Sequence, residues 1–101
     1  MTNYQKSAQD IAEKYSLSTE AFPRYADLVS EVGELGKEML KSGNYGMGEI
    51  IVNNELIMEF GDVLFSLAAL ANILDIDMDE AFAAATDKYR KRFEVTGQIG
   101  S

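Results

Sequence analysis

Cysteine and histidine, two chemically versatile residue types, are missing from this chain of 101 residues. Without cysteine there can be no disulfide and no thiolate metal site. Without histidine there can be no imidazole zinc ligand, no histidine general base and no Ser-His-Asp triad. Any metal site must therefore be built mainly from oxygen ligands, which favour Mg²⁺, with Mn²⁺ as a possible substitute, over Zn²⁺.

Basic residues are scarce as well, because 9 Lys plus Arg stand against 17 Asp plus Glu, a formal net charge of −8. Non-specific nucleic-acid binding needs a basic surface, so we expect no nucleic-acid partner. A small anionic ligand could still bind if a cation bridges it to the protein. The first ten residues lack the apolar segment of a secretory signal, so we expect a cytoplasmic protein.

Proline occurs once, and 47% of the residues are hydrophobic, which fits a folded helical protein of one domain over residues 1–101. Apolar residues at helical spacing predict four helices and no convincing strand. We expect these helices from about Tyr4 to Tyr15, from near Pro23 to Ser42, from Asn53 or Asn54 to about Leu74, and from the capping residue Asp77 to about Phe93. A glycine- and asparagine-rich loop, 43–54, separates the second helix from the third. The sequence thus predicts an all-α, four-helix bundle-like fold that oligomerises through helix faces.

The stretch from Leu56 to Leu74 is apolar nearly throughout, yet it contains Glu59 and Asp62. Its length is compatible with a membrane span, but two carboxylates near its start argue against one, and we expect no membrane association. A helix at the centre of a bundle is the better interpretation. Because the two acids are spaced i, i+3, they share one face of that helix. Burying them is costly unless they are paired or bind a metal.

Glu31 and Glu34 form a matching pair on the second predicted helix. If the two acidic stripes face each other, four carboxylates converge, and such a cluster either raises some of their pKa values or recruits cations such as Mg²⁺. The alternative is that the acids are solvated edges of amphipathic helices. We favour this alternative for the remaining acids of the two stripes, Asp27, Glu38 and Glu55.

Four of the nine basic residues lie between Lys88 and Arg92. Lys88, Lys91 and Arg92 share one helix face at i, i+3 and i+4 and could hold a polyphosphate. Cations in the last turns of a helix also stabilise its dipole, and for Arg90 we favour this simpler explanation. Asn72, near the end of the apolar run, is either a buried structural amide or a contact to substrate.

These segments together resemble the MazG-like nucleoside triphosphate pyrophosphohydrolases of the all-α NTP pyrophosphatase superfamily. The resemblance covers roughly residues 28–93. It rests on Glu31-Val32-Gly33-Glu34-Leu35, Glu59-Phe60-Gly61-Asp62-Val63-Leu64, Leu70-Ala71-Asn72 and Lys88-Tyr89-Arg90-Lys91-Arg92-Phe93. Ser30 stands where family members often carry a further glutamate, and Glu38 could in part replace it.

The resemblance implies a helical homodimer or homotetramer that hydrolyses a (deoxy)nucleoside triphosphate to the monophosphate and pyrophosphate. It implies that Glu31, Glu34, Glu59 and Asp62 bind Mg²⁺ and that Lys88 and Arg92 hold phosphates, a set that we extend to Lys91 and Asn72 as substrate-binding residues. Water attack at the α-phosphorus needs a proton acceptor, and we expect Glu34, or otherwise Glu31, in this catalytic role. The expected physiological setting is the nucleotide pool. Two alternatives stay open: a related reaction such as phosphoribosyl-ATP hydrolysis, and a non-catalytic helical binding module.

Overall fold

A computed structural model describes residues 2–97; residue 1 and residues 98–101, which the single-domain prediction includes, lie outside the described residues. Four α-helices follow one another: α1 (Asn3–Lys14), α2 (Ala21–Ser42), α3 (Asn54–Ile73) and α4 (Met78–Thr96). A single 3₁₀ turn, η1 (Asn44–Gly46), interrupts the loop after α2, and no strand occurs in the described part of the chain. The all-α prediction is confirmed.

Three of the four helices begin where a side chain caps the backbone, as the sequence predicts for two of them. The Asn53 side chain accepts a hydrogen bond from the backbone N–H of Leu56 at 2.8 Å. Asp77 accepts hydrogen bonds from Asp79 N–H at 2.9 Å and Glu80 N–H at 3.2 Å. Thr2 caps α1 in the same way. These bonds satisfy N–H groups that have no partner within their own helix, so the helix starts are defined locally.

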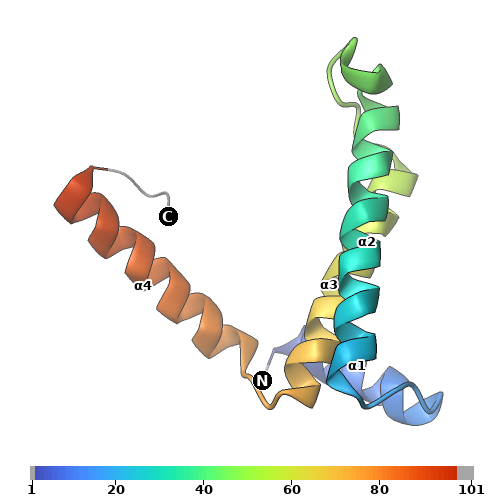
Figure 1. The fold of residues 1–101 in the computed structure, drawn as a ribbon, viewed down its shortest axis with the longest axis vertical. Coiled ribbons are helices and arrows are strands. Elements are labelled where there is room, and N and C mark those ends of the chain that lie inside the picture. Colours follow the sequence, from blue (N-terminus) through green and yellow to red (C-terminus); the bar gives the residue numbers. More distant parts are fainter. Residues whose placement is uncertain (1, 98–101) are drawn as a thin grey trace.

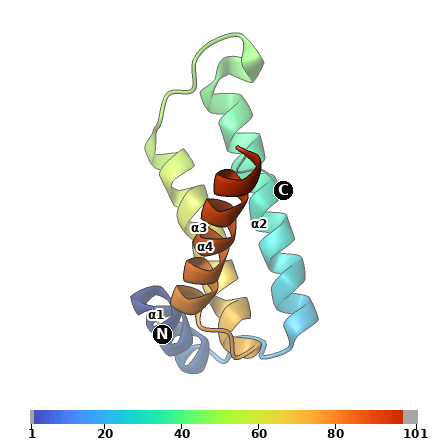
Figure 2. The same cartoon turned by 90° about the vertical axis from the view of Figure 1, so that its left-hand side faces the viewer.

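The core lies around α3, which packs against both α1 and α2 (Figures 1 and 2). Its buried residues are mostly small, which lets the neighbouring helices approach closely. The buried apolar residues of the described chain are Ala8, Leu56, Ala68, Ala69 and Ala71. The long apolar run is thus the central helix that the sequence predicts.

By length and composition alone, α3 is also apolar enough to cross a membrane. The core helix of a soluble protein passes the same test, so this finding is weak evidence for a span. Here α3 packs against two other helices of the chain. The absence of a membrane partner stays a prediction.

α4 differs from the other helices because it leaves the end of α3 at an angle and extends away from α2 and α3 (Figure 1). No residue of α4 is buried. Large apolar side chains on it, among them Phe82 and Phe93, are exposed, Phe82 by 72%. Three helices therefore pack together in the single chain, and the fourth does not complete a closed bundle with them.

Candidate metal centre

Three carboxylates converge between α2 and α3, which pack side by side. Glu31 projects from α2, and Glu59 and Asp62 project from α3; each is half-buried, and one oxygen of each lies within 4.8 Å of the others. The i, i+3 spacing places Glu59 and Asp62 on one face of α3, and the packing of α2 against α3 brings Glu31 opposite them. The structure thus brings together three of the four carboxylates predicted from the sequence.

Glu34 is the fourth predicted carboxylate, and it lies outside this group of three. Its side chain is exposed, one turn beyond Glu31 on α2. Residues three apart on a helix differ by about 60° around its axis, so one can face a neighbouring helix while the other faces solvent. Glu34 is still close enough for its charge to contribute to the raised pKa of Glu31.

The electrostatics of the cluster are unfavourable for a protein without a bound cation. Partial burial raises the pKa of Glu31 above its ordinary value of 4.5, and the negative charges of Asp62 and Glu59 raise it further. No Lys or Arg of the described chain forms an ion pair with Glu31, Glu59 or Asp62.

The donor set fits a hard divalent cation. Carboxylate oxygens are preferred ligands of Mg²⁺ and Mn²⁺, and two oxygens on opposite sides of an octahedral Mg²⁺ lie about 4.2 Å apart. Oxygens in adjacent positions lie about 3 Å apart. The three carboxylate oxygens lie within 4.8 Å of one another, a limit that includes both spacings. Small side-chain rotations would therefore bring all three carboxylates to one ion, and the remaining coordination positions would be open to water or to a phosphate oxygen.

The raised pKa of Glu31 predicts a pH dependence of stability in the metal-free protein. The pKa of Glu31 is higher in the folded state than in the unfolded chain. Its ionisation therefore leaves the free energy of unfolding unchanged well below pH 4.5, the ordinary pKa, and lowers that free energy as pH rises from there through the raised pKa. In EDTA, we expect wild type to lose stability relative to Glu31→Gln as pH rises from about 4 to 7. Melting temperatures of both proteins across that range test this. Parallel curves for the two proteins would contradict it.

The predicted phosphate-binding residues lie on α4, away from the carboxylate cluster (Figure 1). The ammonium group of Lys91 donates a hydrogen bond to Asp87 at 2.9 Å, and this interaction lowers the pKa of Asp87. The Lys88 ammonium lies 4.7 Å from the centre of the Tyr89 ring. One guanidinium nitrogen of Arg92, Nη1, is shielded from water and has no hydrogen-bond partner in the described structure. The three cations thus lie on a helix that does not fold back toward the carboxylate cluster of the same chain.

Asn72, predicted as a substrate contact or a structural amide, has both polar ends of its side chain in hydrogen bonds. Its Oδ1 accepts from Gln5 Nε2 at 3.1 Å, and its Nδ2 donates to the backbone carbonyl of Gln5 at 2.8 Å. These bonds are those of a structural amide that joins α1 to α3. A role in substrate binding stays a prediction.

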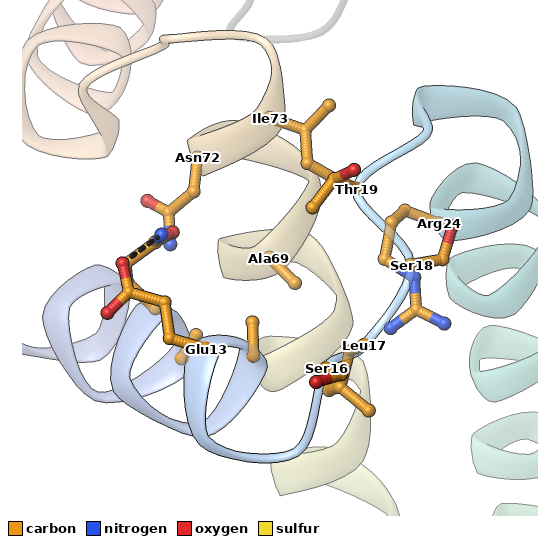
Figure 3. Close-up of a pocket in the computed structure, with 12 residues that line it drawn as sticks. Glu13, Ser16, Leu17, Ser18, Thr19, Arg24, Ala69, Asn72 and Ile73 are labelled. Atoms are coloured by element: carbon orange, nitrogen blue, oxygen red, sulfur yellow. Dashed lines mark hydrogen bonds between the residues drawn. The ribbon is translucent and has the colours of Figure 1, made fainter.

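Asn72 also lies in the wall of a separate cavity of about 330 Å³ between α1, the α1–α2 loop and the end of α3 (Figure 3). Figure 3 shows Arg24 and Asn72 on different sides of this cavity, with Ala69 and Ile73 of α3 between them. None of the four predicted metal-binding carboxylates lines it. This cavity is therefore distinct from the candidate metal centre.

Gln5, the largest side chain that is fully buried in the described structure, was not predicted to have a role. A signal was available, because Gln5 precedes Ala8 by three residues and so lies on the apolar stripe of the first helix. A glutamine on a buried stripe needs hydrogen-bond partners, and here the side chain has them at Thr2, on α3, in the α3–α4 link and at the start of α4.

Comparisons with known proteins identify the family of the chain. The sequence model of the MazG nucleotide pyrophosphohydrolase domain matches residues 24–95. A Bacillus subtilis (strain 168) protein described as "Uncharacterized protein YpjD" is 38% identical over 72 residues, which cover 66% of this chain and 61% of the relative. The chain thus spans about three fifths of the length of that relative. No solved structure matches. The match extends from the start of α2 almost to the end of α4 and includes all three clustered carboxylates, so this chain belongs to the MazG nucleotide pyrophosphohydrolase domain family.

Proposed function

We propose that the protein is a Mg²⁺-dependent nucleoside triphosphate pyrophosphohydrolase. Water attacks the α-phosphorus of a (deoxy)nucleoside triphosphate, the bond from the α-phosphorus to the bridging oxygen breaks, and the products are the nucleoside monophosphate and pyrophosphate. The observation that carries the proposal is the convergence of Glu31, Glu59 and Asp62 from two helices, within a chain of the MazG family.

Each carboxylate has a role that its position supports. Glu31, Glu59 and Asp62 hold the cation, with Glu34 reaching it from one turn beyond or through water. When bound, Mg²⁺ neutralises phosphate charge and lowers the pKa of a water molecule. Glu34 lies outside the group of three, so coordination would not use its carboxylate fully, and the free oxygen can accept a proton from the attacking water; Glu31 is the second candidate for this role.

Lys88, Lys91 and Arg92 bind the phosphate groups. Within one chain, α4 directs these cations away from the carboxylate cluster. We therefore propose that α4 of a second copy supplies them, in a homodimer or homotetramer. Opposite charges support this arrangement, because the cluster is an uncompensated concentration of negative charge and one short stretch near the end of α4, residues 88–92, carries four of the nine basic residues.

Exposed apolar side chains support the same assembly. They occur on α2, α3 and α4, and include Val32, Met39, Ile57, Phe60, Phe82 and Phe93. Apolar patches of this extent are unusual on a monomer of this size and mark protein interfaces. The mass of the protein by light scattering tests the assembly, and a monomer at assay concentration would contradict it.

The substrate is a nucleotide of the cytoplasmic pool. A panel of canonical and modified deoxynucleoside and ribonucleoside triphosphates, with phosphoribosyl-ATP included, tests the activity by pyrophosphate release with and without Mg²⁺. Metal-dependent release from any triphosphate supports the proposal and begins to define its base and sugar preference. If a folded protein that binds Mg²⁺ releases pyrophosphate from phosphoribosyl-ATP alone, the related reaction replaces the proposed one.

Metal binding can be tested without an activity assay, because a bound ion raises the melting temperature. A ligand at 100 times its Kd stabilises the folded state by about 2.7 kcal/mol, which in a domain of this size raises Tm by roughly 10–20 °C. We expect Mg²⁺ or Mn²⁺ to raise the Tm of wild type and not of Asp62→Asn. Thermal unfolding followed by circular dichroism measures both. Equal shifts in the two proteins would place the cation elsewhere.

A further inference from the structure

We infer that Gln5 is a positioning residue: its buried carboxamide, together with Asn72, fixes the direction in which α4 leaves α3 and hence where the cations of α4 are presented. The structural half of this inference stands on its own. Its consequence for phosphate binding rests on the proposed function. Gln5 lies outside residues 24–95, the region that matches the family.

The carboxamide of Gln5 is buried and fully used. The residue is 1% exposed. Its Nε2 donates to Asn72 Oδ1 at 3.1 Å and to the backbone carbonyl of Ile76 at 2.7 Å. Its Oε1 accepts from the backbone N–H of Met78 at 2.9 Å and, within α1, from that of Thr2 at 3.4 Å. One side chain of α1 thus contacts the end of α3, the α3–α4 link and the first residue of α4.

The bond to Met78 completes the cap of α4. A helix begins with N–H groups that have no acceptor in the preceding turn. Asp77 accepts from two of them, those of Asp79 and Glu80. Gln5 accepts from the first, that of Met78. The start of α4 is therefore held both by its own N-cap and by a residue 73 positions earlier in the sequence.

The link from α3 to α4 is short and shaped by its backbone. α3 ends at Ile73 and α4 begins at Met78. Asp75 adopts a left-handed conformation with φ of 55°, and the Ile76 N–H donates to the Ala71 carbonyl at 2.9 Å. The side chain of Gln5 donates to the carbonyl of the same residue, Ile76, which belongs to the next peptide group. Together these bonds leave the link little freedom to turn.

Beyond its first residues and the link, little contact with the rest of the chain holds α4 in its direction. The helix has no buried residue and no extensive packing against α1, α2 or α3. A helix of 19 residues acts as a lever about 28 Å long, so a small rotation at Met78 moves Lys88 and Arg92 by several ångströms. The hydrogen bonds of Gln5 therefore control a displacement at the predicted phosphate-binding residues.

Spin labels can measure this direction, because the chain has no cysteine of its own. We place cysteines at exposed Lys37 on α2 and exposed Ala84 on α4 and measure the distance between the two labels by pulsed electron paramagnetic resonance. Dilution with unlabelled protein before refolding restricts the signal to distances within one chain. Gln5→Met keeps the length of the side chain and removes all four of its hydrogen bonds, including the one that its Oε1 accepts from Thr2 N–H in the capping box of α1. Gln9→Met is the matched control, since Gln9 lies one turn further along α1 and bonds only to Glu13 among the described side chains.

We expect a narrow distribution of label distances in the spin-labelled protein without further substitution and in Gln9→Met. In Gln5→Met we expect a broad or shifted distribution. We expect kcat/KM for the nucleotide to fall by about 10- to 100-fold in Gln5→Met, mostly through KM, as misplaced phosphate contacts predict. The Mg²⁺-induced rise in Tm should persist, because the carboxylate cluster is untouched. If Gln5→Met does not fold, Gln5→Glu replaces it, since this variant keeps the acceptor for Met78 and, because burial favours the protonated carboxyl, keeps at most one of the two donated bonds.

Unchanged distances in a folded Gln5 variant would overturn the inference. A broadened distance with unchanged kcat/KM would overturn its functional half. If the unmodified protein releases no pyrophosphate from any nucleotide, the proposed function fails, while the distance measurement still tests the role of Gln5.

Discussion

Glu59→Gln is expected to abolish metal-dependent pyrophosphate release, with a loss in kcat/KM of about a hundredfold or more. The substitution removes one negative charge from a cluster in which oxygens of three carboxylates lie within 4.8 Å of one another. A neutral amide is a weaker ligand for Mg²⁺ than a carboxylate, and the charge that offsets the phosphates is lost with the ion. The measurement is initial rates of pyrophosphate release against nucleotide and Mg²⁺ concentration.

Stability separates this loss from simple unfolding. The charge of Glu59 raises the pKa of Glu31, so its removal relieves repulsion. Without metal, Glu59→Gln should therefore melt at the same temperature as wild type or higher. Glu55→Gln is the matched control, because Glu55 is exposed on the same helix and is not part of the cluster. If Glu59→Gln retained full activity, the cluster would not be the catalytic metal site.

Two inactive variants mixed together are expected to recover activity. One is Glu59→Gln, with a defective cluster, and the other is Lys88→Ala/Arg92→Ala, with a defective α4. If each site combines the cluster of one copy with α4 of another, random assembly from an equal mixture gives about a quarter of the sites both intact parts, and about a quarter of wild-type activity. The two proteins can be unfolded and refolded together, since no disulfides have to form again.

A second mixture provides the control for this result. Glu59→Gln and Asp62→Asn both damage the cluster of their own chain, so no assembly of the two contains an intact cluster. Their mixture should stay inactive whatever the oligomeric state. If the first mixture also stays inactive although light scattering shows mixed oligomers, α4 acts on the cluster of its own chain, and the proposed exchange of α4 between copies is wrong.

Local signals in the sequence account for most of the secondary structure. Asn53 and Asp77 cap the helices that they were predicted to cap, and Gly43 follows the last residue of α2. Such signals depend on a few neighbouring residues, so they can be recognised without knowing the fold. The boundaries of α1 and α4 differ from the predicted ones by one to three residues. The signals that set them are local, a capping box at Thr2 and a left-handed glycine, Gly97, after α4, and the prediction did not use them.

The candidate site was only partly predictable. The acids on α3 stand out because the rest of that helix is apolar, and the structure places both in the cluster. Glu31 and Glu34 are equivalent in the sequence pattern, and only the packing of α2 against α3 distinguishes them. Gln5 and Asn72 are 67 residues apart, and no local pattern connects them.

The sequence by itself determined that the protein is helical, where its helices start, that any metal ligands are oxygens, and which two helices carry the acids. These properties follow from composition and from interactions over three or four residues. The tertiary structure decided that three carboxylates meet, that Glu34 stands apart, and that α4 points away from the cluster. These three features depend on how helices that are distant in the sequence pack against one another. They also depend on single hydrogen bonds, such as the one between Gln5 and Met78, whose partners meet only in the folded chain.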